Sequence, residues 1–184
     1  PGELVVNGMS PSQRNARFAN SGIVVAVDQH DYQHLNHYGP LAAMQFQAEV
    51  EQKAWAVAGM TQAAPAQRLI DFIENRMSSS VLETSYHPGL IAADMRAFLP
   101  GFVADALRQG FKSFGHKMAG YLTNDAQIIG VESRTSSPVR IPRDKTTLQH
   151  PQLVNLFPCG EGAGYAGGIV SAAMDGERCA EAAV

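Results

Sequence analysis

The chain has 184 residues, of which 45% are hydrophobic and 17% are charged, and its net charge is −3. These values suit one compact domain or a piece of a larger protein, and the slightly acidic balance gives no reason to expect nucleic acid as a partner. No apolar run approaches the roughly 20 residues that span a bilayer, so we expect no membrane segment. The first residues have no basic start and no long apolar core, so no secretory signal is visible.

The chain begins on Pro-Gly rather than on Met, and its first predicted strand has no earlier element to pair with. We therefore expect an excised piece of a longer protein or a processed chain. Two cysteines do not make a disulfide framework, and this favours a reducing, cytoplasmic location.

The first part of the chain predicts two short strands, a loop and a long helix. Runs of β-branched residues place the strands at Glu3–Val6 and Ile23–Val27. The polar, histidine-rich stretch Gln29–Tyr38 predicts a loop. A helix is predicted over Pro40–Ala58, because proline suits its first turn and Gly59 follows its end.

Three histidines recur at intervals of four and three residues: His30, His34 and His37. On a helix their imidazoles would share one face, which is an arrangement that binds metal ions. The stretch is polar and is followed by Gly39-Pro40, and these features favour a solvated loop. We therefore expect no metal site.

The middle of the chain predicts helices followed by strands. A second helix is predicted over Pro65–Asn75, and a further helical stretch begins at Pro88. The clearest amphipathic helix is Pro100–Ala119, where apolar residues recur every three or four positions. Gln127–Ser133 and Val139–Ile141 then predict strands, so the expected fold class is α+β, with helices packed on a mixed sheet.

The end of the chain predicts a strand, a glycine-rich turn and a helix. The apolar run Leu153–Phe157 predicts a buried strand, and the small-residue stretch Ile169–Ala183 predicts a helix. Between them lie five glycines: Gly160, Gly162, Gly164, Gly167 and Gly168. Glycine adopts positive φ values and carries no Cβ, so such a turn can bring backbone N–H groups close to an anionic or electron-rich ligand.

The residues of this turn indicate the kind of ligand. Glu161 can accept hydrogen bonds from a ligand hydroxyl, as in a sugar or a ribitol chain. Gly167, Gly168 and Ile169 start the helix, whose free N–H groups and partial positive charge favour a phosphate or the pyrimidine edge of a flavin. The alternative is a tight structural turn with a closely packed helix and no ligand.

Three arginines surround a hydroxyl-rich turn in ESRTSSPVRIPRD: Arg134, Arg140 and Arg143. A guanidinium is a planar fork that binds substrate carboxylates or cofactor phosphates. The alternative is a solvated hairpin, in which the arginines form local ion pairs with Glu132 and Asp144.

Cys159 adjoins the glycine-rich turn. A reactive thiol needs an exposed, electropositive setting, and no CxxC partner is present. We therefore expect Cys159 to be a small buried residue.

The segment GEGAGYAGGIVSAAMDG (Gly160–Gly176) resembles the C-terminal FAD-contacting segment of the uncharacterised FAD-dependent dehydrogenases. This family is also called the NAD(FAD)-utilising dehydrogenases, and it belongs to the glutathione-reductase-like flavoprotein superfamily. Five further segments are similar, in the same order along the chain: VVNGMS (Val5–Ser10), ANSGIVV (Ala19–Val25), PLAAMQFQAEVEQKAW (Pro40–Trp55), APAQRLIDF (Ala64–Phe72) and GVESRTSSPVRIPRD (Gly130–Asp144).

The resemblance implies that the parent protein is an FAD-dependent oxidoreductase that passes a hydride between a small-molecule substrate and the flavin, with NADH or NADPH as a further partner. It implies a substrate-side domain over residues 1–150 and a final FAD-contacting strand, turn and helix over residues 151–184. The cofactor-binding residues would be Gly160, Glu161, Gly162, Gly167, Gly168 and Ile169. Arg134 and Arg140 become substrate-side candidates, and no catalytic acid or base is identified.

The sequence also departs from the family pattern. Members carry an N-terminal βαβ unit with a G-x-G-x-x-G turn that holds the ADP part of FAD. Gly162–Gly167 matches these letters, but no βαβ unit follows it. We therefore expect the chain to be the C-terminal portion, with the missing FAD-binding portion as its partner. The fragment alone is expected to bind FAD weakly or not at all and to be inactive.

Two other interpretations stay open. The chain could be a non-catalytic α+β module that binds a phosphate or a nucleotide at the Gly160–Ile169 turn. It could also be an interaction surface whose apolar face packs on the missing portion. A G-x-G-x-x-G unit in the upstream sequence would favour the enzyme, and concentration-dependent self-association of the fragment would favour the interaction surface.

Overall fold

A computed structural model describes residues 2–8 and 12–184 of the chain. Met9 and Ser10, at the end of the VVNGMS segment, therefore lie outside the described residues. The chain divides into two compact units: Pro1–Asp28 with Ala48–Ser133, and Gln29–Gln47 with Arg134–Val184. The domain boundary expected at residue 150 stays a prediction, because compact units and functional domains need not coincide.

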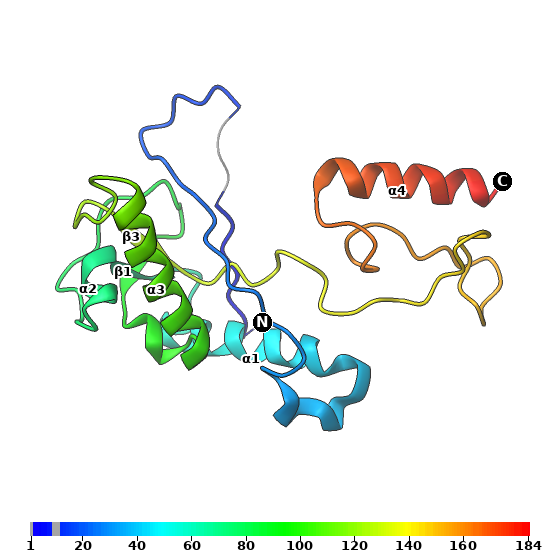
Figure 1. Cartoon of the computed structure of the whole chain (residues 1–184), viewed down its shortest axis with the longest axis horizontal. Coiled ribbons are helices and arrows are strands. Elements are labelled where there is room, and N and C mark those ends of the chain that lie inside the picture. The colour runs from blue at the N-terminus through cyan, green and yellow to red at the C-terminus, as the bar shows by residue number, and fades with distance from the viewer. Residues whose placement is uncertain (1, 9–11) are drawn as a thin grey trace. The chain divides into compact units, whose positions relative to one another are not determined.

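The described residues form helices and a small mixed sheet, which confirms the α+β class (Figure 1). In chain order these are η1 (Gln33–Leu41), α1 (Ala42–Val57), β1 (Ala64–Arg68), α2 (Leu69–Ile73), β2 (Leu90–Ala92), η2 (Met95–Ala97), α3 (Gly101–Lys117), β3 (Gln127–Ile129) and α4 (Ile169–Ala182), where η marks a 3-10 helix. The helices α1, α3 and α4 agree closely with the ranges predicted from the sequence.

The sheet lies in the first unit and has the strand order β2-β1-β3. The central strand pairs with β2 in parallel and with β3 in antiparallel orientation, so that Ala66 lies opposite Ala92 on one side and Ile129 on the other. All residues of β1 except Arg68 are buried. The sheet is therefore the inner layer of this unit.

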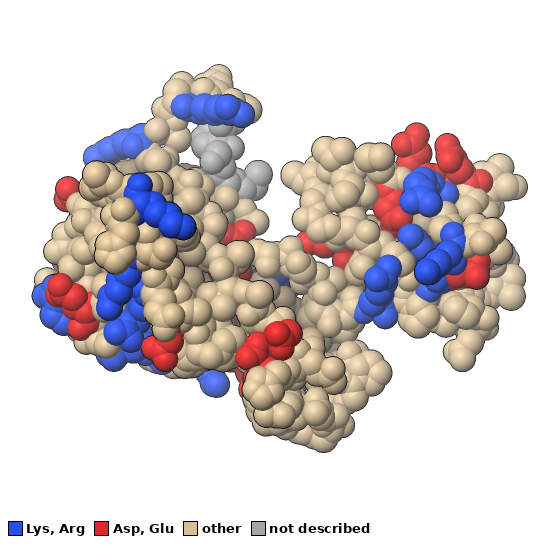
Figure 2. Space-filling model, in the orientation of Figure 1, with Lys and Arg blue, Asp and Glu red and all other residues tan. Residues whose placement is uncertain are grey.

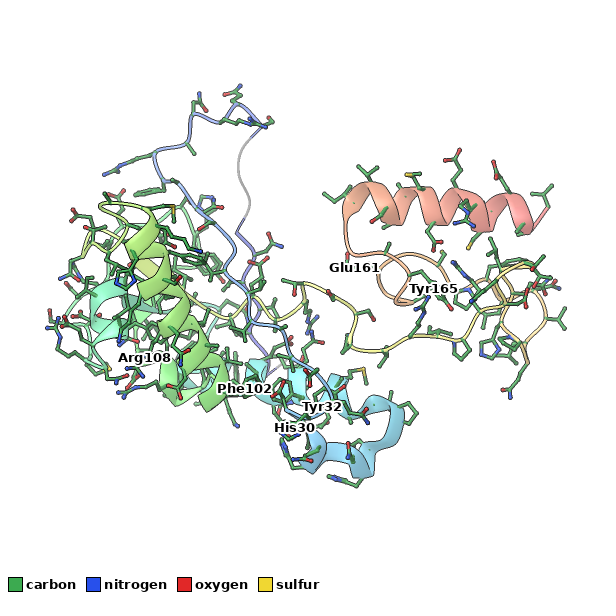
Figure 3. The ribbon with its side chains drawn as sticks, viewed as in Figure 1. His30, Tyr32, Phe102, Arg108, Glu161 and Tyr165 are labelled. Atoms are coloured by element: carbon green, nitrogen blue, oxygen red, sulfur yellow. The ribbon has the colours of Figure 1, made fainter. Side chains whose placement is uncertain are left out.

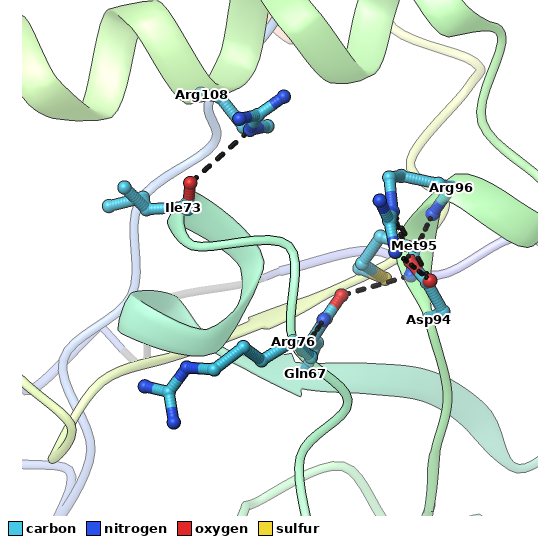
Figure 4. Close-up of polar contacts among 7 residues, drawn as sticks. All are labelled: Gln67, Ile73, Arg76, Asp94, Met95, Arg96 and Arg108. Atoms are coloured by element: carbon cyan, nitrogen blue, oxygen red, sulfur yellow. Dashed lines mark hydrogen bonds and ion pairs between the residues drawn. The ribbon is translucent and has the colours of Figure 1, made fainter.

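A buried glutamine ties β1 to the segments around it (Figure 4). The side chain of Gln67 is fully buried, and its oxygen accepts from the Met95 N–H at 3.0 Å while its NH₂ group donates to the Arg76 carbonyl at 2.6 Å. Arg108 of α3 donates to the Ile73 carbonyl at 3.4 Å. A buried polar group left without a partner costs about 1–3 kcal/mol, so these contacts hold η2 and the loop after α2 in place.

Aromatic side chains fill the core of the first unit. Phe72, Phe98 and Phe111 are 1%, 2% and 4% exposed. The rings of Phe72 in α2 and Phe111 in α3 meet edge to face, with centroids 6.1 Å apart. Leu107 and Phe114 also pack on this cluster, so the apolar repeat predicted for α3 does face the core.

Four predicted strands are absent from the described residues: Glu3–Val6, Ile23–Val27, Val139–Ile141 and Leu153–Phe157. The first of these still packs as an extended segment, because Leu4 and Val6 are buried. Their N–H groups donate to the carbonyls of Glu51 and Val131 at 3.2 and 2.8 Å. The segment thus has the burial of a strand without a continuous ladder of hydrogen bonds.

The buried strand predicted over Leu153–Phe157 is wrong. Leu153 and Val154 are 55% and 82% exposed, and the segment forms a bend and a turn. Its Leu156 carbonyl accepts from His150 N–H just upstream, at 2.8 Å. A buried strand needs a neighbour for its N–H and C=O groups, and the sheet of the described residues contains only β1, β2 and β3.

Three other predicted elements need correction. The helix predicted over Pro65–Asn75 is present only in its second part, as α2, because β1 occupies the first part. The helical stretch predicted from Pro88 is instead β2 followed by η2. The loop predicted over Gln29–Tyr38 runs into the 3-10 helix η1.

Candidate functional site

The predicted site lies in the second unit, in the loop before α4, and we call residues 158–168 the glycine turn. Two of its glycines have the positive φ values that favour glycine, 70° at Gly160 and 83° at Gly164. The turn closes on itself, because Gly164 N–H donates to the Glu161 carbonyl at 2.9 Å and Tyr165 N–H donates to the Gly160 carbonyl at 3.0 Å. Figure 3 labels Glu161 and Tyr165, which both come from this loop.

An earlier segment, residues 137–141, packs directly against the glycine turn. Ile141 N–H donates to the Ala163 carbonyl at 3.1 Å. A Cβ atom added to Gly164 would lie 2.7 Å from the carbonyl oxygen of Val139, which is closer than real Cβ atoms approach. Glycine is therefore required at position 164 both by its φ angle and by the lack of space.

A buried ion pair joins α4 to the loop that follows residue 141. The side chains of Arg143 and Asp175 are 8% and 9% exposed, and two hydrogen bonds of 2.9 Å connect them. A bidentate contact of this kind is the strongest that arginine makes with a carboxylate. The Arg143 guanidinium lowers the pKa of Asp175, and the Asp175 carboxylate raises the pKa of Arg143. Each partner therefore favours the charged form of the other.

The same pair holds the glycine turn. The Asp175 carboxylate accepts from Gly160 N–H at 2.9 Å, and Arg143 donates to the Pro158 carbonyl at 2.9 Å. Arg143 also lies 3.1 Å from the sulfur of Cys179, which follows Asp175 by one helical turn. The turn is thus fastened to α4 at two points, Pro158 and Gly160.

Tyr165 carries further arginine contacts. The guanidinium carbons of Arg143 and Arg140 lie 3.7 and 4.3 Å from the centre of its ring, which are cation–π contacts. Its hydroxyl donates to the Ile141 carbonyl at 2.9 Å. The structure thus brings Arg140, one substrate-side candidate, beside the turn predicted to hold the cofactor. The other candidate, Arg134, is exposed at the start of the second segment of this unit.

The start of α4 is accessible. Its N-cap residue is Gly168, and no side chain of the described residues caps it. Its first residues, Ile169 and Val170, are 88% and 72% exposed. Three other predicted cofactor residues are exposed as well: Glu161, Gly162 and Gly167. The first turn of α4 is therefore exposed and has no side-chain cap, and its N–H groups carry the partial positive charge that favours an anion or a flavin edge.

Asp175 is the residue of this site that the sequence pattern does not reveal. The alternative interpretation of the arginine segment gave its arginines local ion pairs with Glu132 and Asp144. For Arg143 this alternative is wrong, since its carboxylate partner is Asp175, 32 residues away. Asp144 instead accepts from the backbone N–H groups of its own turn, including that of Thr146 at 2.8 Å. The available signal was an aspartate one helical turn before a cysteine in a helix of small residues.

The two cysteines lie in opposite environments. Cys159 is exposed, so the burial predicted for it is wrong. Cys179 is 3% exposed, and burial raises the pKa of its thiol. Of the two cysteines, only Cys159 lies in the glycine turn and is accessible to solvent.

We expect one thiol of the folded protein to react rapidly with Ellman's reagent and the second to react only after unfolding. The reason is that the reagent must reach a thiolate, and Cys179 is buried with a raised pKa. Cys159→Ser should remove the rapid phase, and Cys179→Ser should leave it in place. Two rapidly reacting thiols in the folded protein would contradict this arrangement.

The surface of the described residues carries mixed charge. On the face drawn in Figure 2, acidic and basic side chains are interspersed. Within residues 2–8 and 12–184, no group of three or more His, Cys, Asp or Glu side chains is arranged to hold a metal ion. None of the helices in this described part is long and apolar enough to cross a membrane.

Comparison with known proteins gives the chain a family. A glycine turn before a helix is common among proteins that bind nucleotide cofactors, but many other turns share it, so the turn defines only a broad class. Residues 1–135 match the family described as "FAD-dependent protein, C-terminal domain-like". The match covers more than half of the chain, and the chain belongs to this family.

One curated relative matches nearly the whole chain. It is an uncharacterized protein of Clostridium beijerinckii (strain ATCC 51743 / NCIMB 8052), and it is 41% identical over 182 residues. The alignment covers 98% of this chain and 33% of the relative, so the chain spans about a third of the relative's length. The family match ends at residue 135, before the glycine turn, so the family and the geometry of the turn are separate observations.

Proposed function

We propose that this chain is the C-terminal part of an FAD-dependent oxidoreductase that passes a hydride between a small-molecule substrate and the flavin, with NADH or NADPH as a partner. The observation that carries the proposal is the accessible start of α4 at the end of a firmly held glycine turn. The choice of FAD as the cofactor rests on the family of the chain. The glycine turn and the start of α4 would provide backbone N–H groups that bind it.

The residues of the turn suit FAD. Glu161 is exposed and can accept hydrogen bonds from hydroxyls of the ribitol chain. The N–H groups of Gly167, Gly168 and Ile169 would face the pyrimidine end of the flavin. The positive end of the helix dipole there favours the negative charge that builds up on reduction, and so it would raise the reduction potential. When bound, FAD supplies the redox chemistry, and the chain's own residues hold and tune it.

The partner proposed for this chain is the FAD-binding portion of the same protein. α4 exposes the apolar side chains of Ile169, Val170 and Met174, which are 88%, 72% and 59% exposed. Apolar surface of this kind commonly marks a place where another surface packs. Self-association of the isolated chain that disappears in the complete protein would support this partner, whereas a monomeric isolated chain at high concentration would count against it.

The first test is the visible absorption spectrum of the protein expressed from its complete natural open reading frame. We expect flavin bands, and we expect Gly168→Leu to abolish them. A Cβ atom at position 168 would meet only Ser171 Oγ, at an ordinary 3.6 Å, so the fold has room for a Cβ atom there. In the proposed site, a leucine side chain would occupy the space of the flavin. Gly110→Leu in α3, where a Cβ meets nothing within 4 Å, is the control that should keep the bands. A colourless protein that takes up no added FAD would refute the proposal.

A second candidate is a non-catalytic module that binds a phosphate or a nucleotide at the same turn. The uncapped start of α4 favours it, because helix N-termini bind phosphate groups. This candidate predicts a colourless protein that binds ADP, with binding lost in Gly168→Leu. It also predicts that the complete protein lacks a G-x-G-x-x-G βαβ unit.

A further inference from the structure

We infer that Arg143 and Asp175 are positioning residues for the cofactor site, because their buried pair sets where the glycine turn and the start of α4 lie relative to each other. The inference rests on the proposed function. The two side chains are 8% and 9% exposed, and their hydrogen bonds go to protein groups. They therefore act on a ligand through the backbone rather than by touching it.

The pair joins three segments that are separate in the sequence. Arg143 lies in the loop that follows residue 141, Pro158 and Gly160 belong to the glycine turn, and Asp175 lies in α4. No β-strand lies among the described residues of the second unit. The position of the turn therefore depends on a small number of polar contacts, and this pair makes two of them directly.

The position of the Arg143–Asp175 pair also determines the position of the start of α4. Asp175 lies six positions after Ile169, which is a distance of about 9 Å along an α-helix. A hydrogen-bonded helix of this length behaves as a rigid element. Asp175 accepts hydrogen bonds from Gly160 N–H and from the Arg143 guanidinium. Because α4 is rigid, these bonds also set the direction of the N–H groups in its first turn.

The chemistry of arginine matters to this role. The guanidinium donates two parallel bonds to Asp175 and a further bond to the Pro158 carbonyl, all at 2.9 Å. A lysine at position 143 would retain the charge but would lose the planar fork. Arg143→Lys should therefore keep the unit folded and allow the turn to move.

The test uses the protein expressed from its complete natural open reading frame, titrated with FAD and followed by flavin fluorescence and by the reduction potential of the bound flavin. We expect Asp175→Asn and Arg143→Lys to weaken FAD binding by on the order of tenfold to a hundredfold, because small displacements of a positioning group have effects of this size. We also expect a lower reduction potential of the bound flavin, since the positive end of the α4 dipole would no longer point at the flavin. A purely structural role would reduce the amount of bound flavin without changing its potential.

The control is a second arginine–aspartate pair in the first unit. The Arg96 Nε–H donates to the two Asp94 carboxylate oxygens, at 3.0 and 3.2 Å. A terminal guanidinium nitrogen of Arg96 also donates to the Asp94 carboxylate, at 2.6 Å. Asp94→Asn repeats the chemical change of Asp175→Asn in the compact unit that does not contain the glycine turn. It should leave both the FAD affinity and the flavin potential at their wild-type values.

Three outcomes would count against these ideas in different ways. A wild-type protein that binds no flavin refutes the proposed function, and the inference with it. A wild-type protein that binds flavin, with Arg143→Lys and Asp175→Asn equal to Asp94→Asn in affinity and potential, overturns the inference alone. If Asp175→Asn does not fold, Arg143→Lys carries the test by itself, and a wild-type potential in that variant overturns the inference.

Discussion

Replacing Phe72 with alanine is expected to lower the free energy of unfolding of the first unit by about 3–5 kcal/mol. The Phe72 side chain is 1% exposed and belongs to the main hydrophobic cluster. Its ring meets that of Phe111 edge to face. The substitution therefore removes buried apolar area and an aromatic contact, and it leaves a cavity in the core. Because small domains are stable by only about 5–15 kcal/mol, this loss is a large fraction of the total.

The measurement is urea unfolding followed by the fluorescence of Trp55, the only tryptophan in the chain, which packs partly against the same cluster. Met77→Ala is the matched control, because Met77 is 58% exposed and its loss should change the stability by less than about 0.5 kcal/mol. An unfolding midpoint for Phe72→Ala equal to that of Met77→Ala would contradict the described core.

Helices could be predicted from the sequence where a helical repeat of apolar residues coincides with residues typical of helix ends. In α3 the spacing of Leu107, Phe111 and Phe114 matches the helical period, and these side chains do pack on the core. In α4 the preceding glycines mark the start of the helix. In both cases the information lies within one segment of the chain, so no knowledge of distant contacts was needed.

Of the three strands of the described residues, β3 falls within the strand predicted over Gln127–Ser133, whereas β1 and β2 were missed because their local sequence signal is weak. β1 has the sequence APAQR, whose alanine, proline and glutamine have little preference for strands, and its continuous burial leaves no alternation to detect. Its partners β2 and β3 lie far along the chain, at Leu90–Ala92 and Gln127–Ile129. The opposite error occurred at Leu153–Phe157, where apolar residues without a strand to pair with remain exposed.

The candidate site divides in the same way. The glycine turn was recognised from the sequence because glycine itself is the signal, and Gly160 and Gly164 do adopt positive φ values. The ion pair between Arg143 and Asp175 was not recognised from the sequence, because the spacing of charged residues suggests only local partners for Arg143. Asp144 is its neighbour in sequence, but that carboxylate caps its own turn, which leaves the more distant Asp175 as the partner.

Gly164→Ala is expected to disrupt the glycine turn more than any other alanine substitution within it. The left-handed backbone at φ 83° costs a residue with a Cβ atom about 1–2 kcal/mol. The added Cβ atom would also lie 2.7 Å from the Val139 carbonyl oxygen and 3.1 Å from the Arg140 Cα, and overpacking of this kind costs about 1–3 kcal/mol more. Both neighbours are backbone atoms, so neither can move aside without displacing the segment.

Gly167→Ala is the matched control, because position 167 has no positive φ and a Cβ atom there meets nothing within 4 Å. Hydrogen exchange of the peptide that spans the turn is the measurement. In the wild-type protein and in Gly167→Ala, the Tyr165 N–H should be protected by its bond to the Gly160 carbonyl, and in Gly164→Ala it should exchange rapidly. Equal protection in the two variants would mean that the turn tolerates a side chain at 164. In that event the close approach of the Val139 carbonyl would not be what fixes the conformation of the turn at Gly164.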